Sequence, residues 1–359
     1  SLLQITLDRF FSKDSTAKFE TQSTKLVEQA ICVGSIEHKF LMKDIVDESE
    51  ASSKFILEPL PRNTSAAMAA TCLMAGKDEI LVFCPSDHFI NDLDEYINTV
   101  ILASYSVEKN TIVALGARPT FPSTAYGYMD VFKKSKDQKF FNVRKFIEKP
   151  DLKNAQQLIE SKNVFWNAGS FMAYPDTVLD ALDKFAPDIL NHVVKAFKAG
   201  KRSGSSLLLD HDWMEKCRSE SIDYAVMEKT DDAVVVPMDA GWSDIGSWSS
   251  LWDVSDKDSK GNAIYGDVML HESHNSYIRT DGKLVAVIGV DDLVIVSTKD
   301  VLVVAHKDRA QDVKGVAQQL KEESRGEWEN HREVYRPWGK YDSIDSGTRY
   351  QVKRITLKP

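Results

Sequence analysis

Cysteine is scarce in this sequence of 359 residues, which contains four cysteines and no C-x-x-C pair. A small secreted domain held by disulfides, or a zinc site built on cysteine pairs, needs more thiols at closer spacing. Three of the four cysteines lie in apolar periodic segments. We therefore predict that Cys32, Cys72, Cys84 and Cys217 are reduced core residues of a cytoplasmic protein.

Long apolar runs and an excess of positive charge are also missing. No run approaches the ~20 residues of a membrane span. The opening residues "SLLQITLDRFF" lack the charged start and the cleavage site of a signal peptide. The formal net charge of -9 argues against a general nucleic-acid binder. Phosphate substrates stay compatible with it, because a few local cations or a metal ion can offset the global sign.

The first 255 residues alternate between short apolar strands and helical patterns. The strand candidates are "QAICVG", "KFILEP", "EILVFCP", "TIVALGA", "VRKFIEKP", "SFMAYP" and "AVVVPMD". Between them lie helical patterns such as Ala66–Ala75, Leu93–Val107 and Thr177–Phe185. This alternation predicts an α/β domain over residues 1–255, with a Rossmann-like, mostly parallel sheet covered on both faces. Ligands bind such sheets at the carboxyl ends of the strands.

A polar break, "DKDSKGN", separates this pattern from a series of short β segments. The last two of them, Leu293–Asp300 and Val301–Asp308, form an octet repeat that predicts stacked or hairpinned strands. We assign residues 261–325 to a small β domain that ends in a helix near Ala310–Glu323. Residues 326–359 form a charged linker and the beginning of further strands.

Two acidic residues follow buried strands. Asp87 lies in "FCPSDHFI", and Asp244 lies between two glycines in "GWSDIGSWSSLW". Carboxylates at two strand ends could share one Mg²⁺, which takes one or two protein carboxylates and keeps waters or phosphate oxygens as its other ligands. The alternatives are an Asx-type turn for Asp87 and a helix cap for Asp244. His88 is expected to be a structural neighbour rather than a ligand or base.

The segment "EPLPRNTSAAMAAT" joins a strand to an alanine-rich helix. Asn63 or Thr64 is placed to cap that helix, and a helix N-terminus beside Arg62 is a natural anion site. An ordinary strand–loop–helix connection with a surface arginine is the alternative.

Three further segments carry polar groups suited to a sugar phosphate: "STAYGYMD", "FIEKPD" and "FWNAGSFM". Gly127 allows a close approach to a ligand. Glu148 can accept hydrogen bonds from hydroxyls, Lys149 can neutralise a phosphate, and Asn167 offers a donor and an acceptor. Each of these signals is weak alone, since Glu-Lys-Pro is also a common surface turn.

Taken in order, the motifs make the chain closely resemble the mannose-1-phosphate guanylyltransferases, in the long bacterial form fused to a phosphomannose isomerase. The motifs that carry this resemblance are "SLLQITLDR", "EPLPRNTSAA", "PSDHFI", "TAYGYM", "FIEKPD", "FWNAGSF", "SIDYAVMEK", "GWSDIGSW" and "YRPWGKYDSID". The resemblance implies a nucleotide-diphospho-sugar transferase fold, then a left-handed β-helix-like domain, then the entry into a cupin-type isomerase domain. It also implies the reaction of GTP with mannose 1-phosphate to give GDP-mannose and pyrophosphate.

The resemblance also implies residue roles. Asp87, Asp244 and Lys149 are the expected catalytic residues, and the two aspartates are the expected Mg²⁺ ligands. The expected nucleotide contacts are Pro61, Arg62, Asn63 and Ser86. The expected sugar-phosphate contacts are Tyr126, Gly127, Glu148, Lys149, Asn167 and Trp242.

The sequence departs from the family pattern at both ends. The family opens with a strand and a signature of the form G-G-x-G-T-R-L-W-P, whereas the first glycine here is Gly34. The His/Glu metal cluster of the isomerase is also absent from these residues. We therefore expect a longer protein, and little or no activity from this chain alone. Ala125 stands where the family usually has the glycine of T-G-Y-G.

Two alternative functions stay open. One is a related sugar-1-phosphate nucleotidyltransferase that uses UTP, dTTP or CTP. The other is a catalytically dead subunit that binds a sugar nucleotide. The apolar runs of the β domain need a partner or a domain contact, so a homodimer is a further expectation.

Overall fold

The computed structural model describes residues 1–11, 27–49, 51–132, 139–325 and 332–357. Two units follow one another along the chain, Ser1–Trp242 and Ser243–Pro359, and each is described by itself. All four cysteines lie in the described ranges and are free, as predicted. No helix within these ranges has both the length and the apolar character needed to cross a lipid bilayer.

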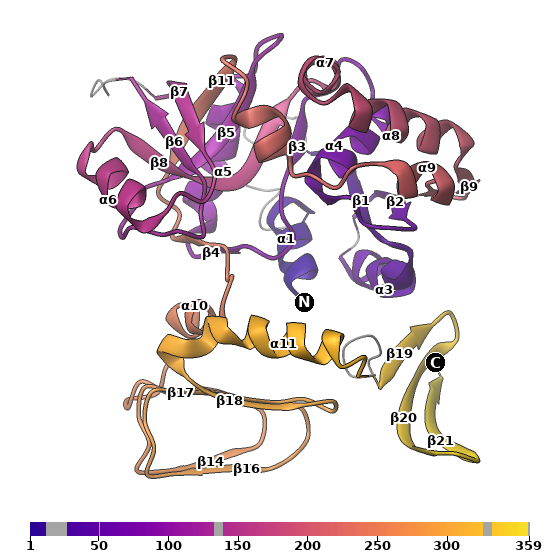
Figure 1. The fold of residues 1–359 in the computed structure, drawn as a ribbon, viewed down its shortest axis with the longest axis vertical. Helices are drawn as coiled ribbons and strands as arrows, with labels where there is room; N and C mark the ends of the chain where they lie inside the picture. Colours follow the sequence, from indigo (N-terminus) through magenta and orange to yellow (C-terminus); the bar gives the residue numbers. More distant parts are fainter. Residues whose placement is uncertain (12–26, 50, 133–138, 326–331, 358–359) are drawn as a thin grey trace. The chain divides into compact units, whose positions relative to one another are not determined.

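A six-stranded sheet forms the centre of the first unit (Figure 1), in the order β3-β8-β5-β11-β7-β6. The strands are β3 (Leu81–Phe83), β5 (Ile112–Ala117), β6 (Tyr128–Val131), β7 (Phe141–Ile147), β8 (Val164–Ala173) and β11 (Ala233–Met238). Among the described strands of this sheet, β5 and β11 are parallel neighbours, and the other pairs are antiparallel.

The second sheet has the order β1-β2-β10-β9. Its strands are β1 (Ala30–Ser35), β2 (Ser53–Glu58), β9 (Lys201–Ser203) and β10 (Ser206–Leu208). β2 pairs in parallel with both β1 and β10, whereas β9 and β10 form an antiparallel hairpin. The predicted α/β class is thus confirmed, but its strand pairing is mixed rather than mostly parallel. An apolar strand buried on both faces has the same pattern in either direction, so the sequence did not reveal this difference.

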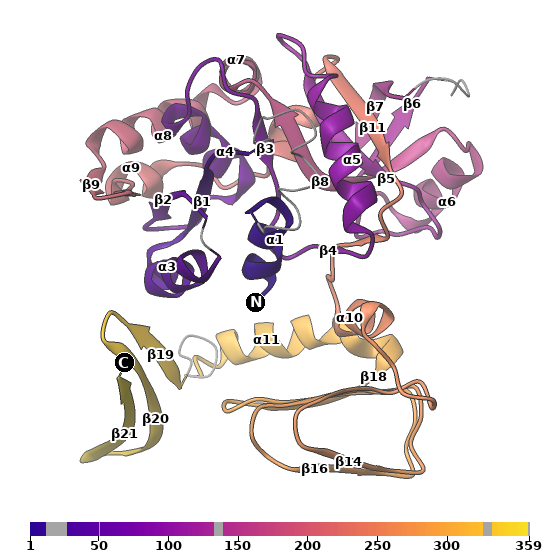
Figure 2. The same ribbon diagram turned by 180° about the vertical axis from the view of Figure 1, so that it is seen from behind.

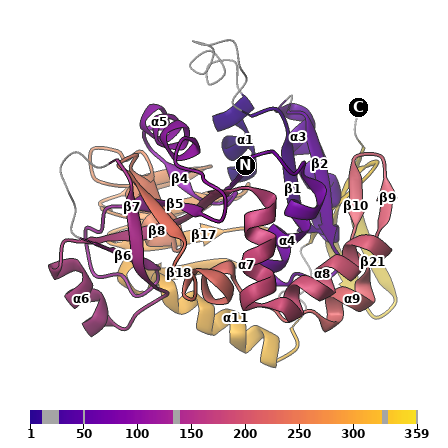
Figure 3. The same cartoon turned by 90° about the horizontal axis from the view of Figure 1, so that it is seen from above.

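Helices cover both faces of the larger sheet, as predicted. Ile112 and Ala114 of β5 join one buried cluster, whereas Val113 and Leu115 join another, because successive side chains of a strand point to opposite faces. The first cluster is shared with α4 (Asn63–Met74), α7 (Pro175–Phe185) and α8 (Pro187–Ala199), which pack against one another (Figure 3). The second is shared with α5 (Leu93–Ser104), which contacts β5 and β11 (Figure 2).

Short elements complete the first unit. They are α1 (Leu2–Phe11), the 3₁₀ turn η2 (Ile36–His38), α3 (Lys39–Glu48), β4 (Phe89–Ile90), α6 (Leu152–Glu160), α9 (His211–Lys216), the π-helical turn η3 (Asp223–Met227) and, at the end, β12 (Trp242–Ser243). α1 packs on α3 through a small core in which Leu7 meets Met42, Val46 and Leu57.

The second unit begins with rungs of parallel strands. β13 (Ala263–Tyr265), β15 (Tyr277–Thr280) and β17 (Leu293–Ser297) are parallel neighbours, and β14 (Val268–His271) pairs in parallel with β16 (Val285–Ile288). The chain therefore stacks like rungs, as a β-helix does (Figure 1). β18 (Leu302–His306) ends the stack by pairing antiparallel with β17. The octet repeat is thus a hairpin, one of the two arrangements that we predicted.

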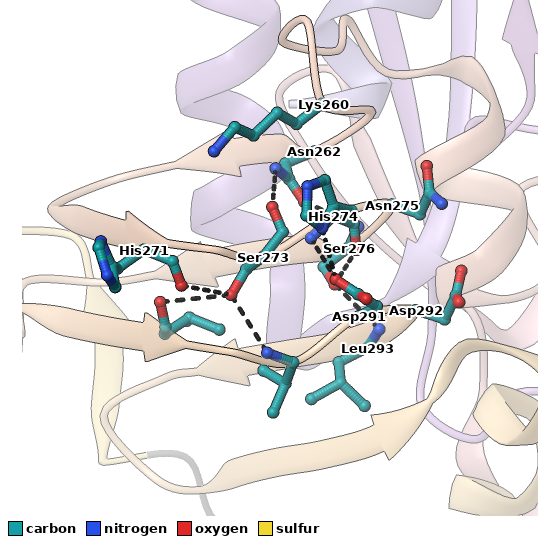
Figure 4. Close-up of polar contacts among 12 residues, drawn as sticks. Lys260, Asn262, His271, Ser273, His274, Asn275, Ser276, Asp291, Asp292 and Leu293 are labelled. Carbon is teal, nitrogen blue, oxygen red and sulfur yellow. Dashed lines mark hydrogen bonds and ion pairs between the residues drawn. The ribbon is translucent and has the colours of Figure 1, made fainter.

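Buried polar side chains hold successive rungs together at one corner of the stack (Figure 4). Asn262, Ser273 and Ser276 are almost completely buried. The Asn262 Nδ2 donates to the Ser273 carbonyl oxygen (2.9 Å), and its Oδ1 accepts from the Ser276 N–H (3.1 Å). The Ser276 hydroxyl in turn accepts from the Leu293 N–H (3.0 Å) of the next rung. Each buried polar group therefore has a partner, which such groups require.

The remaining elements of the second unit are α10 (Trp248–Val254), the 3₁₀ segment η4 (Lys307–Asp312), α11 (Val313–Glu322) and three antiparallel strands, β19 (Glu333–Arg336), β20 (Gly339–Gly347) and β21 (Tyr350–Leu357). Trp248 and Trp252 of α10 pack on a cluster around Tyr277. This packing explains why the unit boundary lies before α10. The domain limits at residues 255 and 325 stay a prediction.

Candidate active site

Two side chains of α1 form hydrogen bonds with the loop that carries Ser86 and Asp87. Arg9 is 5% exposed, and its Nη2 donates to the carbonyl oxygen of His88 (2.5 Å). The Thr6 hydroxyl donates to the carbonyl oxygen of Ser86 (3.4 Å). Ser86 and Asp87 themselves are exposed at the end of β3. Because helix side chains fix the backbone on both sides of Asp87, its carboxylate is presented at the strand end.

His88 supports this loop, as we expected. Its Nδ1 accepts a hydrogen bond from the indole Nε1 of Trp242 (3.1 Å), which requires the neutral ring to carry its proton on Nε2. The two rings meet edge to face, and Trp242 also meets Tyr126 in the same way, at a centroid distance of 5.3 Å. Tyr126 in turn packs on Trp166. An aromatic wall thus connects the loop after β3 with the segment before β6.

Four of the predicted sugar-phosphate residues lie together. A Cβ placed on Gly127 would meet the Glu148 Oε2 and lie 3.3 Å from the Asn167 Cβ, so a larger residue there would displace the Glu148 carboxylate. Lys149 has a φ of +47°, which turns the chain after β7 and places its Nζ 3.3 Å from the Glu148 Oε1. The Glu148 side chain is only 8% exposed, so the surface-turn interpretation fails for Glu148.

The electrostatics of Glu148 are unusual for a carboxyl group. Its Oε2 is buried and has no hydrogen-bond partner among the residues that the structure describes. Burial, with a smaller contribution from the neighbouring Asp223 carboxylate, raises the pKa of Glu148 to about 7, against the opposing effect of Lys149. A buried oxygen without a partner costs free energy, and a ligand donor such as a hydroxyl would remove that cost.

Asp223 is a cluster member that the sequence interpretation missed. Its Oδ1 accepts from the Asn167 Nδ2 (2.8 Å), and burial raises its pKa. The motif "SIDYAVMEK" supported the resemblance, but we gave none of its residues a role. An acid directly before the apolar run "YAVM" was the available signal.

The segment Pro61–Asn63 is built differently from the prediction. Arg62 donates from Nε to the Met214 carbonyl oxygen and from Nη2 to the Glu215 carbonyl oxygen, both at 2.7 Å. Its guanidinium thus binds the C-terminal end of α9. The helix α4 begins at Asn63 with a φ of +67°, and the preceding residue makes no side-chain cap. The Asn63 Oδ1 accepts from the Thr64 N–H (2.8 Å), so Asn63, one of the two predicted capping residues, satisfies an N–H of the first turn. The Thr64 hydroxyl instead accepts from the Ile222 N–H (2.9 Å).

Asp244 lies in the second unit, whereas the other predicted site residues lie in the first. Its Oδ1 accepts from the Gly246 N–H (2.9 Å). The adjacent Ile245 has a φ of +45°, a strained conformation for a β-branched residue. The helix-cap alternative is wrong, because Ser247 caps α10 by accepting from the Ser250 N–H.

A cleft of about 1500 Å³ opens in the first unit. Its lining includes Thr64, Ser86, His88, Gly169 and Asp223, which come from four different motifs. Segments far apart in the sequence therefore meet at one cavity. Its lining among the described residues includes neither Pro61, Arg62 nor Asn63.

Carboxylate oxygens are suitable ligands for a hard divalent cation, and Asp87 is exposed at a strand end where a phosphate chain could share that cation. No group of three His, Cys, Asp or Glu side chains is poised to bind a metal in the part of the chain that the structure describes. The chemistry of Asp87 therefore fits a cation that is bound partly by substrate, as Mg²⁺ usually is.

Three family models match the chain in sequence. A nucleotidyl transferase model matches residues 16–261, a MannoseP isomerase/GMP-like beta-helix domain matches residues 258–320, and a mannose-6-phosphate isomerase C-terminal model matches residues 323–359. Among curated relatives, a mannose-1-phosphate guanylyltransferase of Salmonella montevideo is 44% identical over 92% of this chain and 71% of its own length. The alginate biosynthesis protein AlgA of Pseudomonas aeruginosa is 42% identical over 93% of this chain and 70% of its own length.

The chain belongs to the mannose-1-phosphate guanylyltransferase family. A solved structure described as a mannose-1-phosphate geranyltransferase of Thermus thermophilus superposes with a TM-score of 0.72 at 26% identity, covering 89% of both chains. One described as a mannose-6-phosphate isomerase of Helicobacter pylori has a TM-score of 0.60 at 29% identity, over 68% of this chain and 90% of its own. The predicted family and its fold, with a nucleotidyltransferase domain followed by a β-helix-like domain, are confirmed.

Proposed function

We propose that the protein transfers GMP from GTP to mannose 1-phosphate, giving GDP-mannose and pyrophosphate. The observation that carries this proposal is the cluster of Gly127, Glu148, Lys149 and Asn167 in a chain of this family. Asn167 connects the cluster to the cleft, because it binds Asp223, which lines the cleft. An oxygen of the sugar phosphate attacks the α-phosphorus in line. The bond from the α-phosphorus to the oxygen of the β-phosphate then breaks, and pyrophosphate leaves.

The sugar phosphate would bind at this cluster. The unpartnered Glu148 Oε2 would accept a hydrogen bond from a hydroxyl, and the Lys149 ammonium would neutralise part of the phosphate charge. Tyr126 and Trp242 would flank the sugar as part of the aromatic wall. The contribution of these residues to the rate is orientation of the attacking oxygen.

The nucleotide would bind at the ends of β2 and β3, near Ser86 and the segment Pro61–Asn63. Since the Arg62 guanidinium binds the carbonyl oxygens of α9, we assign Arg62 the role of holding this segment rather than a direct contact with the base.

Asp87 and Asp244 are the proposed magnesium ligands, each to be tested separately. When bound, Mg²⁺ would neutralise charge on the triphosphate and on the leaving pyrophosphate. The buried Arg9 would support this function by holding the backbone on which Asp87 is presented.

We further propose a cytoplasmic enzyme that supplies GDP-mannose for polysaccharide synthesis, because relatives are named for alginate and xanthan biosynthesis. A homodimer is proposed on the exposed apolar side chains of the β-helix, among them Met269 and Ile288.

The test is pyrophosphate release by the protein expressed from its complete gene. The assay supplies GTP, UTP, dTTP or CTP with mannose 1-phosphate, glucose 1-phosphate or galactose 1-phosphate. We expect the highest kcat/KM for GTP with mannose 1-phosphate. A preference for another nucleotide would indicate the related transferase, and release with none of them, together with binding of GDP-mannose, would indicate a dead subunit.

A further inference from the structure

A single π-helical turn, Asp223–Met227, connects the two segments of the sugar-phosphate cluster. The turn is closed by a hydrogen bond from the Glu228 N–H to the Asp223 carbonyl oxygen (2.9 Å). π-Helical turns are rare and often occur at functional sites. The Ile222 N–H donates to the Thr64 hydroxyl, so the turn is also fixed to the start of α4.

Asp223 fixes the side-chain amide of Asn167. The Nδ2 of Asn167 donates to the Asp223 Oδ1 (2.8 Å), and its Oδ1 accepts from the Gly169 N–H (3.0 Å). Because a carboxylate can only accept and an N–H can only donate, these two bonds leave one orientation for the amide. One N–H of Nδ2 and one lone pair of Oδ1 remain for a ligand.

The other end of the same turn fixes Glu148. The Oε1 of Glu228 accepts from the Glu148 backbone N–H (2.9 Å). Two carboxylates from one turn thus position two predicted ligand-binding residues, Asn167 on β8 and Glu148 after β7. Asp223 is also one of the residues that line the cleft.

We propose that Asp223 is a positioning residue of the sugar-phosphate site, which orients the Asn167 amide and thereby determines the affinity for mannose 1-phosphate. This inference rests on the proposed function. Nothing in the sequence motifs or in the comparisons assigns Asp223 a role.

Electrostatics support this arrangement. After burial, the charge of Asp223 is the next cause that raises the pKa of Glu148, while Lys149 opposes it and Glu228 adds a smaller increase. Burial likewise raises the pKa of Asp223. Removing the charge of Asp223 should therefore make Glu148 lose its proton at lower pH.

Two variants separate orientation from charge. Asp223→Val removes both acceptor oxygens, so we expect the KM for mannose 1-phosphate to rise roughly tenfold or more. The KM for GTP should change less than about twofold, because the Asp223 side chain binds Asn167, whereas the contact of this turn with Thr64 on α4 is made by the Ile222 backbone N–H. Asp223→Asn keeps an acceptor oxygen, so its KM for mannose 1-phosphate should stay within about threefold of the unsubstituted protein. The pH profile of kcat/KM should shift toward lower pH in Asp223→Asn.

The control is Asp231→Asn, an exposed aspartate a short distance along the chain. It should leave both KM values and the pH profile unchanged. The proposal is overturned if Asp223→Val keeps its KM for mannose 1-phosphate, or if it raises the KM for GTP equally. Should Asp223→Val not fold, an unshifted pH profile in the isosteric Asp223→Asn would overturn it.

Failure of this inference differs from failure of the proposed function. If the unsubstituted protein releases no pyrophosphate with GTP and mannose 1-phosphate, the proposed function fails, and the inference fails with it. If that protein is active and the Asp223 variants match it, the inference alone fails.

Discussion

Arg9 and His88 are 79 positions apart in the sequence, yet the Arg9 guanidinium donates to the His88 carbonyl oxygen at 2.5 Å. The contact joins the first helix to the loop after β3. Arg9 is almost completely buried, and burial lowers the pKa of its guanidinium. Burial of a cation is costly when no carboxylate pairs with it, and the residues that the structure describes give Arg9 no such ion pair. The hydrogen bond to the His88 carbonyl oxygen offsets part of this cost.

The first prediction concerns this contact. Arg9→Met fills a similar volume but leaves the His88 carbonyl without its donor. We expect kcat to fall about tenfold or more, because the Asp87 loop loses its position. Steady-state pyrophosphate assays would measure this change. Lys43→Met, an exposed cation on α3, is the control and should match the unsubstituted protein. An unchanged kcat in Arg9→Met would remove Arg9 from the support of the site.

The second prediction concerns the proposed metal ligands. Asp87→Asn and Asp244→Asn should each lower kcat by about 100-fold or more, because an amide binds Mg²⁺ more weakly than a carboxylate does. Titration of activity with Mg²⁺ should show a higher half-saturating concentration in each variant. Asp183→Asn, exposed on α7, serves as the control. Near-normal turnover in either variant would exclude that residue from the metal site.

The third prediction is a pH dependence of stability. Burial raises the pKa of Glu148 to about 7, above the ordinary value of 4.5 for a glutamate. Between these two pH values the folded state binds more protons than the unfolded state. The contribution of Glu148 to the free energy of unfolding therefore falls as pH rises. Glu148→Gln removes this loss, and its unfolding free energy should exceed that of the unsubstituted protein at pH 8 by on the order of 1–3 kcal/mol.

Urea denaturation at pH 5 and at pH 8 would measure this effect. The difference between Glu148→Gln and the unsubstituted protein should be larger at pH 8. Glu160→Gln, exposed at the end of α6, should show no such pH-dependent difference. If Glu148→Gln behaves like Glu160→Gln, the carboxyl of Glu148 does not hold a proton at neutral pH.

The fourth prediction concerns the corner of the β-helix. Ser276→Ala removes the acceptor for the Leu293 N–H and the donor to the His274 carbonyl oxygen. Leaving such groups unpaired costs about 1–3 kcal/mol. Hydrogen exchange should therefore become faster at the Leu293 amide and across β15 and β17. Ser259→Ala, on the exposed turn before β13, is the control. Equal exchange in both variants would show that this ladder does not stabilise the rungs.

Much of the fold could be predicted from local sequence pattern. β5 is a continuous apolar run, and it is buried at every position. The direction of pairing could not be predicted, because β8 is antiparallel to β3, β5 and β6, and that direction depends on the connections rather than on the composition of the strand.

The sequence predicted those site residues whose side-chain type itself suggests a chemical role. Gly127, Glu148 and Asn167 were selected from separate motifs, and the structure brings them together. Arg62 was expected at an anion-binding site. Its guanidinium instead donates to two carbonyl oxygens of α9, 152 and 153 positions away in the sequence. Arg9 and Asp223 were missed for the same reason, since both act through partners distant in sequence.

The central claim is an attack of the sugar-phosphate oxygen on the α-phosphorus of GTP, and an oxygen label tests it most directly. Mannose 1-phosphate carrying ¹⁸O in its non-bridging phosphate oxygens is incubated with GTP and the protein expressed from its complete gene. Mass spectrometry then locates the label. The account predicts GDP-mannose that retains all of the ¹⁸O and pyrophosphate that contains none. Label in the pyrophosphate, or the absence of GDP-mannose, would contradict it.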